Sequence, residues 1–122
     1  MRREIGSRAA PLSDTTKMPT PDKLIRVLVL TDIVDSTKMT ERLGTDAVTA
    51  LFSQVDRELR GLLASIGGLE IDKTDGFLLM FEEVEPAVAF CVQLHEVLAR
   101  ISSETGHAVS MRAGCHAGEV TV

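Results

Sequence analysis

The chain has 122 residues and a mass of 13.2 kDa, which is enough for one domain and too little for two. Its 44% hydrophobic and 25% charged residues are typical of a folded globular protein and exclude a disordered one. The net charge is −5, divided between +2 in residues 1–23 and −7 in the rest, and Trp and Tyr are absent. This composition argues against nucleic-acid binding, which needs a basic surface and, for single strands, stacking aromatic side chains.

The sequence predicts neither a targeting signal nor a membrane segment. The first residues, Met-Arg-Arg, are not followed by the apolar stretch of a secretory signal. No apolar run approaches the roughly 20 residues that cross a bilayer. Cys91 and Cys115 form no CxxC pair or zinc pattern, so we expect two small buried side chains in a cytoplasmic protein.

The first elements follow from local composition. Residues 1–22 are rich in Gly, Ser, Thr, Pro and Asp, and we predict a disordered tail there. Strand-forming residues over 24–30 predict a buried strand, followed by a short helix over 38–43. Gly44 ends that helix, and Thr45 or Asp46 caps the next one.

The second helix has the clearest pattern in the chain, because apolar residues recur there at spacings of three and four until Gly67-Gly68. These residues are Val48, Leu51, Phe52, Val55, Leu59, Leu62, Leu63 and Ile66. A hairpin is predicted next. Residues 69–73 alternate between apolar and polar, Asp75-Gly76 favours a tight turn, and the apolar 77–81 should lie deeper in the sheet.

A third helix is predicted over 85–101 and a last strand over 107–115. The inner stripe predicted for this helix consists of Val88, Cys91, Val92, Leu94, His95 and Leu98. The order βααββαβ predicts an α+β fold of the ferredoxin-like split βαβ type, an antiparallel sheet with helices on one face. The Gly-Glu-Val-Thr-Val at the end of the sequence suggests that more sheet should follow.

Two carboxylates stand out by their position. Asp32 lies where a buried strand passes into a helix, and a carboxylate there is costly unless something compensates its charge. It is either a helix cap or a metal ligand. Asp75 taken alone is an ordinary turn residue, because Asp-Gly favours tight turns.

Three segments together resemble the catalytic domain of class III adenylate and guanylate cyclases. Residues 30–37, Leu-Thr-Asp-Ile-Val-Asp-Ser-Thr, with Glu-Arg-Leu-Gly at 41–44, resemble the first motif of that family. Gly67-Gly68 leading to Lys-Thr-Asp-Gly-Phe at 73–77 resembles the second, and 112–120 looks like the third. Each is weak alone, but the three occur in the family's order over about 100 residues. The resemblance implies a nucleotide cyclase palm-type sheet over 23–122, truncated at its C-terminus.

The resemblance implies that a nucleoside triphosphate is converted into a 3′,5′-cyclic nucleotide and pyrophosphate, for intracellular signalling. Two ions, Mg²⁺ or Mn²⁺, are implied as cofactors, one for the attacking ribose oxygen and one for the leaving group. Asp32 and Asp75 match the two metal-bridging carboxylates, and the carbonyl of Ile33 completes the second ion's shell. Oxygen ligands suit these ions.

The triphosphate is expected on the amides of residues 34–37, namely Val34, Asp35, Ser36 and Thr37, at a helix N-terminus. Asp35 is interpreted as an N-cap, since beside a triphosphate it would add unfavourable charge. Lys73 resembles a purine-reading lysine, but it lies two residues before Asp75 rather than the family's four, and Thr74 replaces a Gly. It is either a substrate ligand or a solvated strand lysine.

The family's remaining 60 to 70 residues, with its purine-contacting acid and its transition-state Asn and Arg, cannot be placed on this chain. We therefore expect little or no turnover by the chain alone, with ATP or GTP as the ligand and a homodimer through the cyclase domain. The alternative is a degenerate cyclase-like module that binds metal-nucleotide or dimerises to regulate a partner. A diguanylate cyclase or polymerase-palm relative is disfavoured, because the Gly-Gly-Asp/Glu-Glu-Phe turn is missing.

Overall fold

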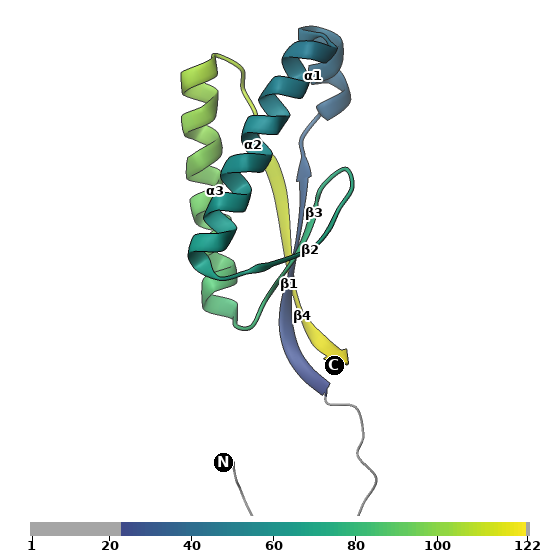
Figure 1. Ribbon diagram of the computed structural model, residues 1–122, viewed down its shortest axis with the longest axis vertical. Coiled ribbons are helices and arrows are strands. Elements are labelled where there is room, and N and C mark those ends of the chain that lie inside the picture. Colours follow the sequence, from purple (N-terminus) through teal and green to yellow (C-terminus); the bar gives the residue numbers. More distant parts are fainter. Residues whose placement is uncertain (1–22, 122) are drawn as a thin grey trace, which may run out of the picture.

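A computed structural model describes residues 23–121, and the tail predicted over 1–22 lies outside the described residues. The elements, in chain order, are β1 (Lys23–Ile33), α1 (Ser36–Leu43), α2 (Thr45–Ile66), β2 (Leu69–Lys73), β3 (Phe77–Phe81), α3 (Val84–Thr105) and β4 (Met111–Thr121) (Figure 1). This is the predicted βααββαβ order.

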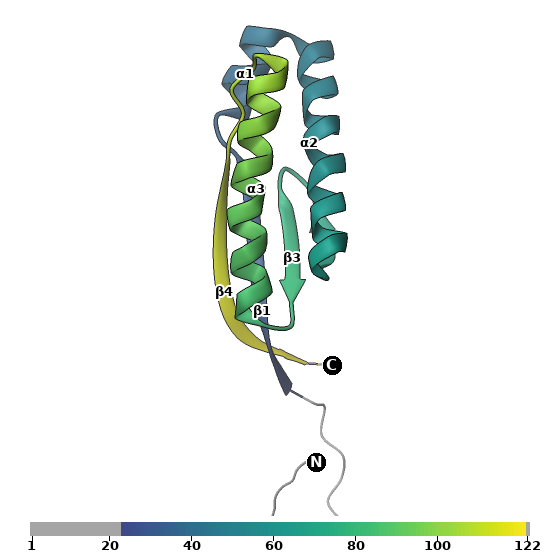
Figure 2. The ribbon, with the colours of Figure 1, turned by 90° about the vertical axis from the view of Figure 1, so that its left-hand side faces the viewer.

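The strands form one antiparallel sheet in the order β2-β3-β1-β4. Strand β1 is central, and it pairs with β4 from Lys23↔Thr121 to Ile33↔Met111. Helices α2 and α3 cover one face of the sheet, while no element among residues 23–121 covers the other, open face (Figures 1 and 2). The α+β architecture predicted from the sequence is therefore confirmed. Strand β3 lies deeper in the sheet than β2, as predicted, and the structure places it between β2 and β1.

The core lies between the sheet and the two long helices. Alternate residues of β1, among them Val27 and Val29, are buried, as are alternate residues of β3. Helix α2 buries the predicted stripe through Val48, Leu51, Val55, Leu59 and Leu63. Burying these side chains stabilises the domain by about 1.5–3 kcal/mol for each large one.

The stripe predicted for α3 is partly wrong. Leu94 and Leu98 are buried, but Val88 and Val92 are 48% and 55% exposed, and His95 is exposed as well. The core positions belong instead to a stripe that includes Phe90, whose ring centroid lies 5.6 Å from that of Phe81. Apolar residues cover much of the circumference of α3, and the side that carries the large aromatic ring packs on the sheet.

Strand β2 also differs from a simple alternating strand. The pairing with β3 shifts between Glu70 and Asp72, which leaves Ile71 as an extra residue in a bulge. Leu69 and Ile71 are 55% and 46% exposed. Glu70 instead faces α2, where Arg60 donates to its carboxylate at 2.8 Å. A salt bridge to the helix thus orients this strand, and its apolar residues are left on the outside.

The last strand begins later than predicted. Residues 107–110 connect α3 to β4, and the strand spans Met111–Thr121 rather than 107–115. The Ser102 hydroxyl on α3 accepts a hydrogen bond from the Val109 amide at 2.9 Å. Its single proton lies between the Leu98 carbonyl at 2.8 Å and the Val109 carbonyl at 3.1 Å. The Val109 amide is therefore bound by a helix side chain, and the β-ladder starts after it.

Candidate functional site

The turn of the β2–β3 hairpin is fixed against the end of β1. The Phe77 amide donates to the buried hydroxyl of Thr31 at 3.1 Å. A Cβ atom added to Gly76 would overlap the backbone carbonyl oxygen of Thr31. Gly76 is therefore required by this close approach, which places the adjacent Asp75 beside the end of β1.

Asp32 follows Thr31 and lies on the open face of the sheet, because side chains alternate along a strand and Thr31 faces the helices. Its side chain is 56% exposed, and its Oδ2 accepts a hydrogen bond from Arg112 Nη2 at 3.0 Å. Arg112 is the Cα partner of Asp32 in the β1–β4 ladder. An exposed ion pair of this kind contributes only about 0–1 kcal/mol, so another ligand of Asp32 can displace it.

Arg112 was not among the residues predicted for the site. It opens the segment that resembles the third cyclase motif, at 112–120, and this was the signal that could have found it. Its place opposite Asp32 depends on the register of two strands 80 residues apart. Sequence spacing alone does not give that register.

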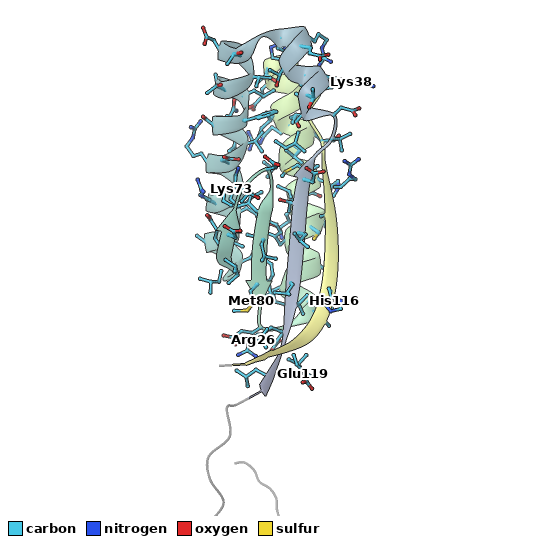
Figure 3. The ribbon with its side chains drawn as sticks, turned by 90° about the vertical axis from the view of Figure 1, so that its right-hand side faces the viewer. Arg26, Lys38, Lys73, Met80, His116 and Glu119 are labelled. Carbon is cyan, nitrogen blue, oxygen red and sulfur yellow. The ribbon has the colours of Figure 1, made fainter. Side chains whose placement is uncertain are left out.

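A surface cavity of about 510 Å³ lies at the start of α1. It is lined by Asp32, Ile33, Asp35, Ser36, Thr37, Lys38, Glu41 and Arg112. Five of these were predicted as site residues, and the structure brings all five to one place. Lys38 and Arg112 add two cations, while Asp35 and Glu41 add two carboxylates (Lys38 is labelled in Figure 3).

The backbone at this cavity has free donors, but fewer than predicted. The Val34 amide donates to the Ser110 carbonyl at 3.0 Å and is therefore already used. The amides of Ser36 and Thr37, in the first turn of α1, have no carbonyl one turn earlier to bind. Asp35 is the N-cap residue with φ 55° and ψ 40°, but its side chain makes no capping hydrogen bond. Asp35 therefore occupies the predicted N-cap position but does not cap the helix with its side chain.

A second cavity, of about 200 Å³, lies on the other side of the same backbone. Asp75 lines it, together with Lys73, and Ile33 and Ser36 line both cavities. The two candidate carboxylates, Asp32 and Asp75, therefore flank one short stretch of backbone between β1 and α1. The two cavities share Ile33 and Ser36, and the hairpin turn approaches this backbone because it packs on Thr31.

Lys73 does not point to the side of Asp32. It is opposite Phe77 in the hairpin, and Phe77 is buried against the helices. Its Nζ donates to the Thr74 carbonyl at 2.9 Å, and lies 3.8 Å from Asp56 Oδ2 on α2. The ammonium also lies 5.1 Å from the centroid of the Phe77 ring. Figure 3 shows Lys73 at the hairpin, apart from Lys38 at α1.

The donor set fits Mg²⁺ or Mn²⁺ bound together with a phosphorylated ligand. Within residues 23–121, no three His, Cys, Asp or Glu side chains are grouped as a preformed metal site. Mg²⁺ is ordinarily held by one or two carboxylates plus substrate phosphates rather than by a complete protein cage. Two exposed aspartates beside free amides are the protein half of such an arrangement.

Comparison with solved structures identifies the fold. The adenylyl cyclase CyaB from P. aeruginosa matches with a TM-score of 0.73 and 17% identity, over 85% of this chain and 61% of that one. The guanylate cyclase domain of RhGC from Catenaria anguillulae, in complex with GTP, matches with a TM-score of 0.71 and 20% identity, over 82% of this chain and 60% of that one. The catalytic core of a rhodopsin-guanylyl cyclase with converted specificity, in complex with ATPαS, matches with a TM-score of 0.72 and 20% identity, over 85% of this chain and 61% of that one.

Residues 23–121 therefore have the fold of a class III nucleotidyl cyclase catalytic domain, as the three sequence motifs implied. The chain spans about 60% of the length of these solved structures. No protein-family model matches the sequence, and neither does any curated protein. In the part of the chain that the structure describes, no helix is both long and apolar enough to span a bilayer.

Proposed function

We propose that this chain is the metal- and triphosphate-binding part of an adenylate or guanylate cyclase domain. The observation that carries the proposal is the cavity at the start of α1, where Asp32, free amides, Lys38 and Arg112 meet. Anionic phosphates are stabilised at a helix N-terminus by unpaired amides and the helix dipole. An acidic chain needs such a local arrangement to bind an anion, since its net charge is −5.

Each residue has a proposed role. Asp32 and Asp75, with the carbonyl of Ile33, would hold two divalent ions, which would supply activation of the ribose 3′-oxygen and binding of the pyrophosphate leaving group. The amides of Ser36 and Thr37 bind phosphate oxygens. A divalent ion at Asp32 would leave Arg112, now paired with that carboxylate, free to pair with the triphosphate.

The proposed substrate is ATP or GTP, and Lys73 does not decide between them. In the described conformation its ammonium is engaged with the Thr74 carbonyl and close to Asp56, on the helix side of the hairpin. A role in reading the purine requires the side chain to leave both partners. Replacing Lys73 with Ala should therefore leave nucleotide preference unchanged if the conformation seen here persists in the complex.

A second candidate function is a cyclase-like module without turnover. It is favoured by one observation: the two candidate metal-binding carboxylates line different cavities, Asp32 the one at the start of α1 and Asp75 the one beside the hairpin turn. Under this alternative the chain still binds metal-nucleotide or a second copy of itself. The open sheet face suits such a partner, because Leu30 and Leu69 are 61% and 55% exposed there.

The experiment that tests the proposal is calorimetric titration of the full chain with a non-cyclisable ATP or GTP analogue, with and without Mn²⁺. We expect binding that requires Mn²⁺ and is lost in Asp32→Ala and in Asp75→Ala. A parallel incubation with Mn²⁺ and ATP or GTP, with products separated by chromatography, distinguishes the two candidates. Cyclic product dependent on both aspartates supports a cyclase, and binding without product supports the module. No binding in any condition refutes the metal-nucleotide site.

A further inference from the structure

The two cysteines of the chain lie side by side, although they are 24 residues apart. The Sγ of Cys91 on α3 is 3.7 Å from the Sγ of Cys115 on β4. Both are free thiols, and Cys91 is half-buried whereas Cys115 is exposed. The prediction that both are buried is therefore wrong for Cys115, and the pair is open to reagents from solvent.

The fold fixes this proximity from both sides. Cys115 is the Cα partner of Val29, and Val29 is completely buried beneath the helices. Directly paired residues point to the same face of a sheet, so Cys115 points toward the helix layer. Helix α3 runs along β1 and β4 on that face (Figure 2). Cys91 lies next to the core residue Phe90, at the margin of the helix surface that packs on the sheet.

The separation is short enough for bond formation. A disulfide has a sulfur–sulfur distance of about 2.05 Å, so the two sulfur atoms, now 3.7 Å apart, must approach by less than 2 Å. Cys115 is exposed to solvent. Within the described residues, β4 pairs with β1 alone, so this strand is also free to adjust toward α3.

We propose that Cys91 and Cys115 form a redox-reactive dithiol, and that a small-molecule disulfide such as glutathione disulfide oxidises it to an intramolecular disulfide fastening β4 to α3. This goes beyond the proposed function and does not depend on it. The Cys115 thiolate attacks one sulfur of glutathione disulfide, forms a mixed disulfide and releases one glutathione thiolate. Deprotonated Cys91 then attacks the Cys115 sulfur and releases the second glutathione.

The reaction is balanced. Two cysteine thiols are oxidised, one glutathione disulfide is reduced to two glutathione thiols, and the two cysteine protons end on those thiols. The order of attack follows from the surroundings. Burial, and then the neighbouring Cys115, raise the pKa of Cys91 to about 11, which leaves it a small thiolate fraction. The exposed Cys115 therefore reacts first, and Cys91 resolves the mixed disulfide.

The bond would act on the strand that carries Arg112, three residues before Cys115. It would give β4 a covalent attachment to α3 in addition to its hydrogen bonds with β1. It would also close a loop of about 25 residues, which lowers the entropy of the unfolded chain. The oxidised protein should therefore unfold at a temperature about 10–20 °C above that of the reduced protein.

The test uses the full chain, reduced and then incubated with glutathione disulfide, quenched by alkylation and digested with trypsin. Cleavage at Arg100 and Arg112 separates the two cysteines, so a linked peptide pair in the monomeric protein reports the bond. We expect that pair, with a rise in Tm that dithiothreitol reverses. The matched variants Cys91→Ser and Cys115→Ser should show neither. A stable glutathione adduct at Cys115 as the final product, a disulfide-linked dimer, or a bond without a rise in Tm would each overturn the proposal.

Discussion

Replacing Gly76 with Ala tests the contact that brings the hairpin turn to the end of β1. The new Cβ would overlap the Thr31 carbonyl oxygen, which is backbone within the central strand and cannot swing aside. The turn must therefore move away from β1. That movement also stretches the hydrogen bond from the Phe77 amide to the Thr31 hydroxyl, now 3.1 Å long.

The expected cost has two parts. Forcing an extra carbon into a packed site costs about 1–3 kcal/mol. Loss of a buried hydrogen bond adds about 0.5–1.5 kcal/mol. For a domain of this size, 1 kcal/mol corresponds to about 4–8 °C in Tm, so a combined cost of at least about 1.5 kcal/mol means that Gly76→Ala should lower Tm by at least about 6 °C. Gly76 is not among the described glycines with positive φ, so the effect reports the contact and not backbone strain.

The assay is thermal unfolding followed by circular dichroism. The matched control is Gly61→Ala in the interior of α2, where an added Cβ meets no atom within 4 Å. This control should raise stability by about 0.8–1 kcal/mol, because Ala favours a helix over Gly. If Gly76→Ala is as stable as the wild type, the hairpin turn does not pack on β1, and the juxtaposition of Asp75 with Asp32 loses its basis.

Three other predictions concern the site, acid stability and the core. Asp32→Asn should abolish Mn²⁺-dependent nucleotide binding in calorimetry, while the free energy of unfolding should change by less than about 1 kcal/mol. The control variant Glu82→Gln, at the far end of the sheet, should leave binding intact. The hydrogen bond from Arg60 on α2 holds the pKa of Glu70 below its usual value of 4.5. The stability contributed by the Arg60–Glu70 pair is therefore complete above pH 4.5 and is lost as the pH falls through the lowered pKa. Glu70→Gln should therefore show a shallower loss of Tm on acidification, and an unchanged slope contradicts the pairing. Leu94→Ala, at a fully buried position on α3, should cost about 2–5 kcal/mol in urea unfolding. Val92→Ala, at a half-exposed position on the same helix, should cost far less, and equal costs would contradict the assigned core face of α3.

The order of elements could be predicted because local pattern determines it. Helix α2 has one apolar stripe, and its bounds and buried face follow from that stripe. Helix α3 has apolar residues on more than one side, so local pattern could not choose between the side of Val88 and Val92 and the side of Phe90. The choice is made by packing against Phe81, which is a tertiary contact.

The candidate site was predictable in its residue types but not in its geometry. Asp32 and the residues after it were found from a motif, and the structure gathers them around one cavity. The partnership of Arg112 with Asp32 depends on strand register, and the direction of Lys73 depends on its pairing with the buried Phe77 after the bulge at Ile71. Neither pairing is encoded in local periodicity.

The separation of the candidate site from the core has an evolutionary consequence. Asp32 is exposed on the open face of the sheet, whereas the side chains that hold the domain together lie on the other face. A lineage could therefore lose Asp32 and keep the same architecture, and a descendant without catalytic activity would have almost the same shape as an active ancestor. For chains with this fold, the presence or absence of acidic residues beside α1 is a better guide to catalytic activity than similarity of the backbone fold.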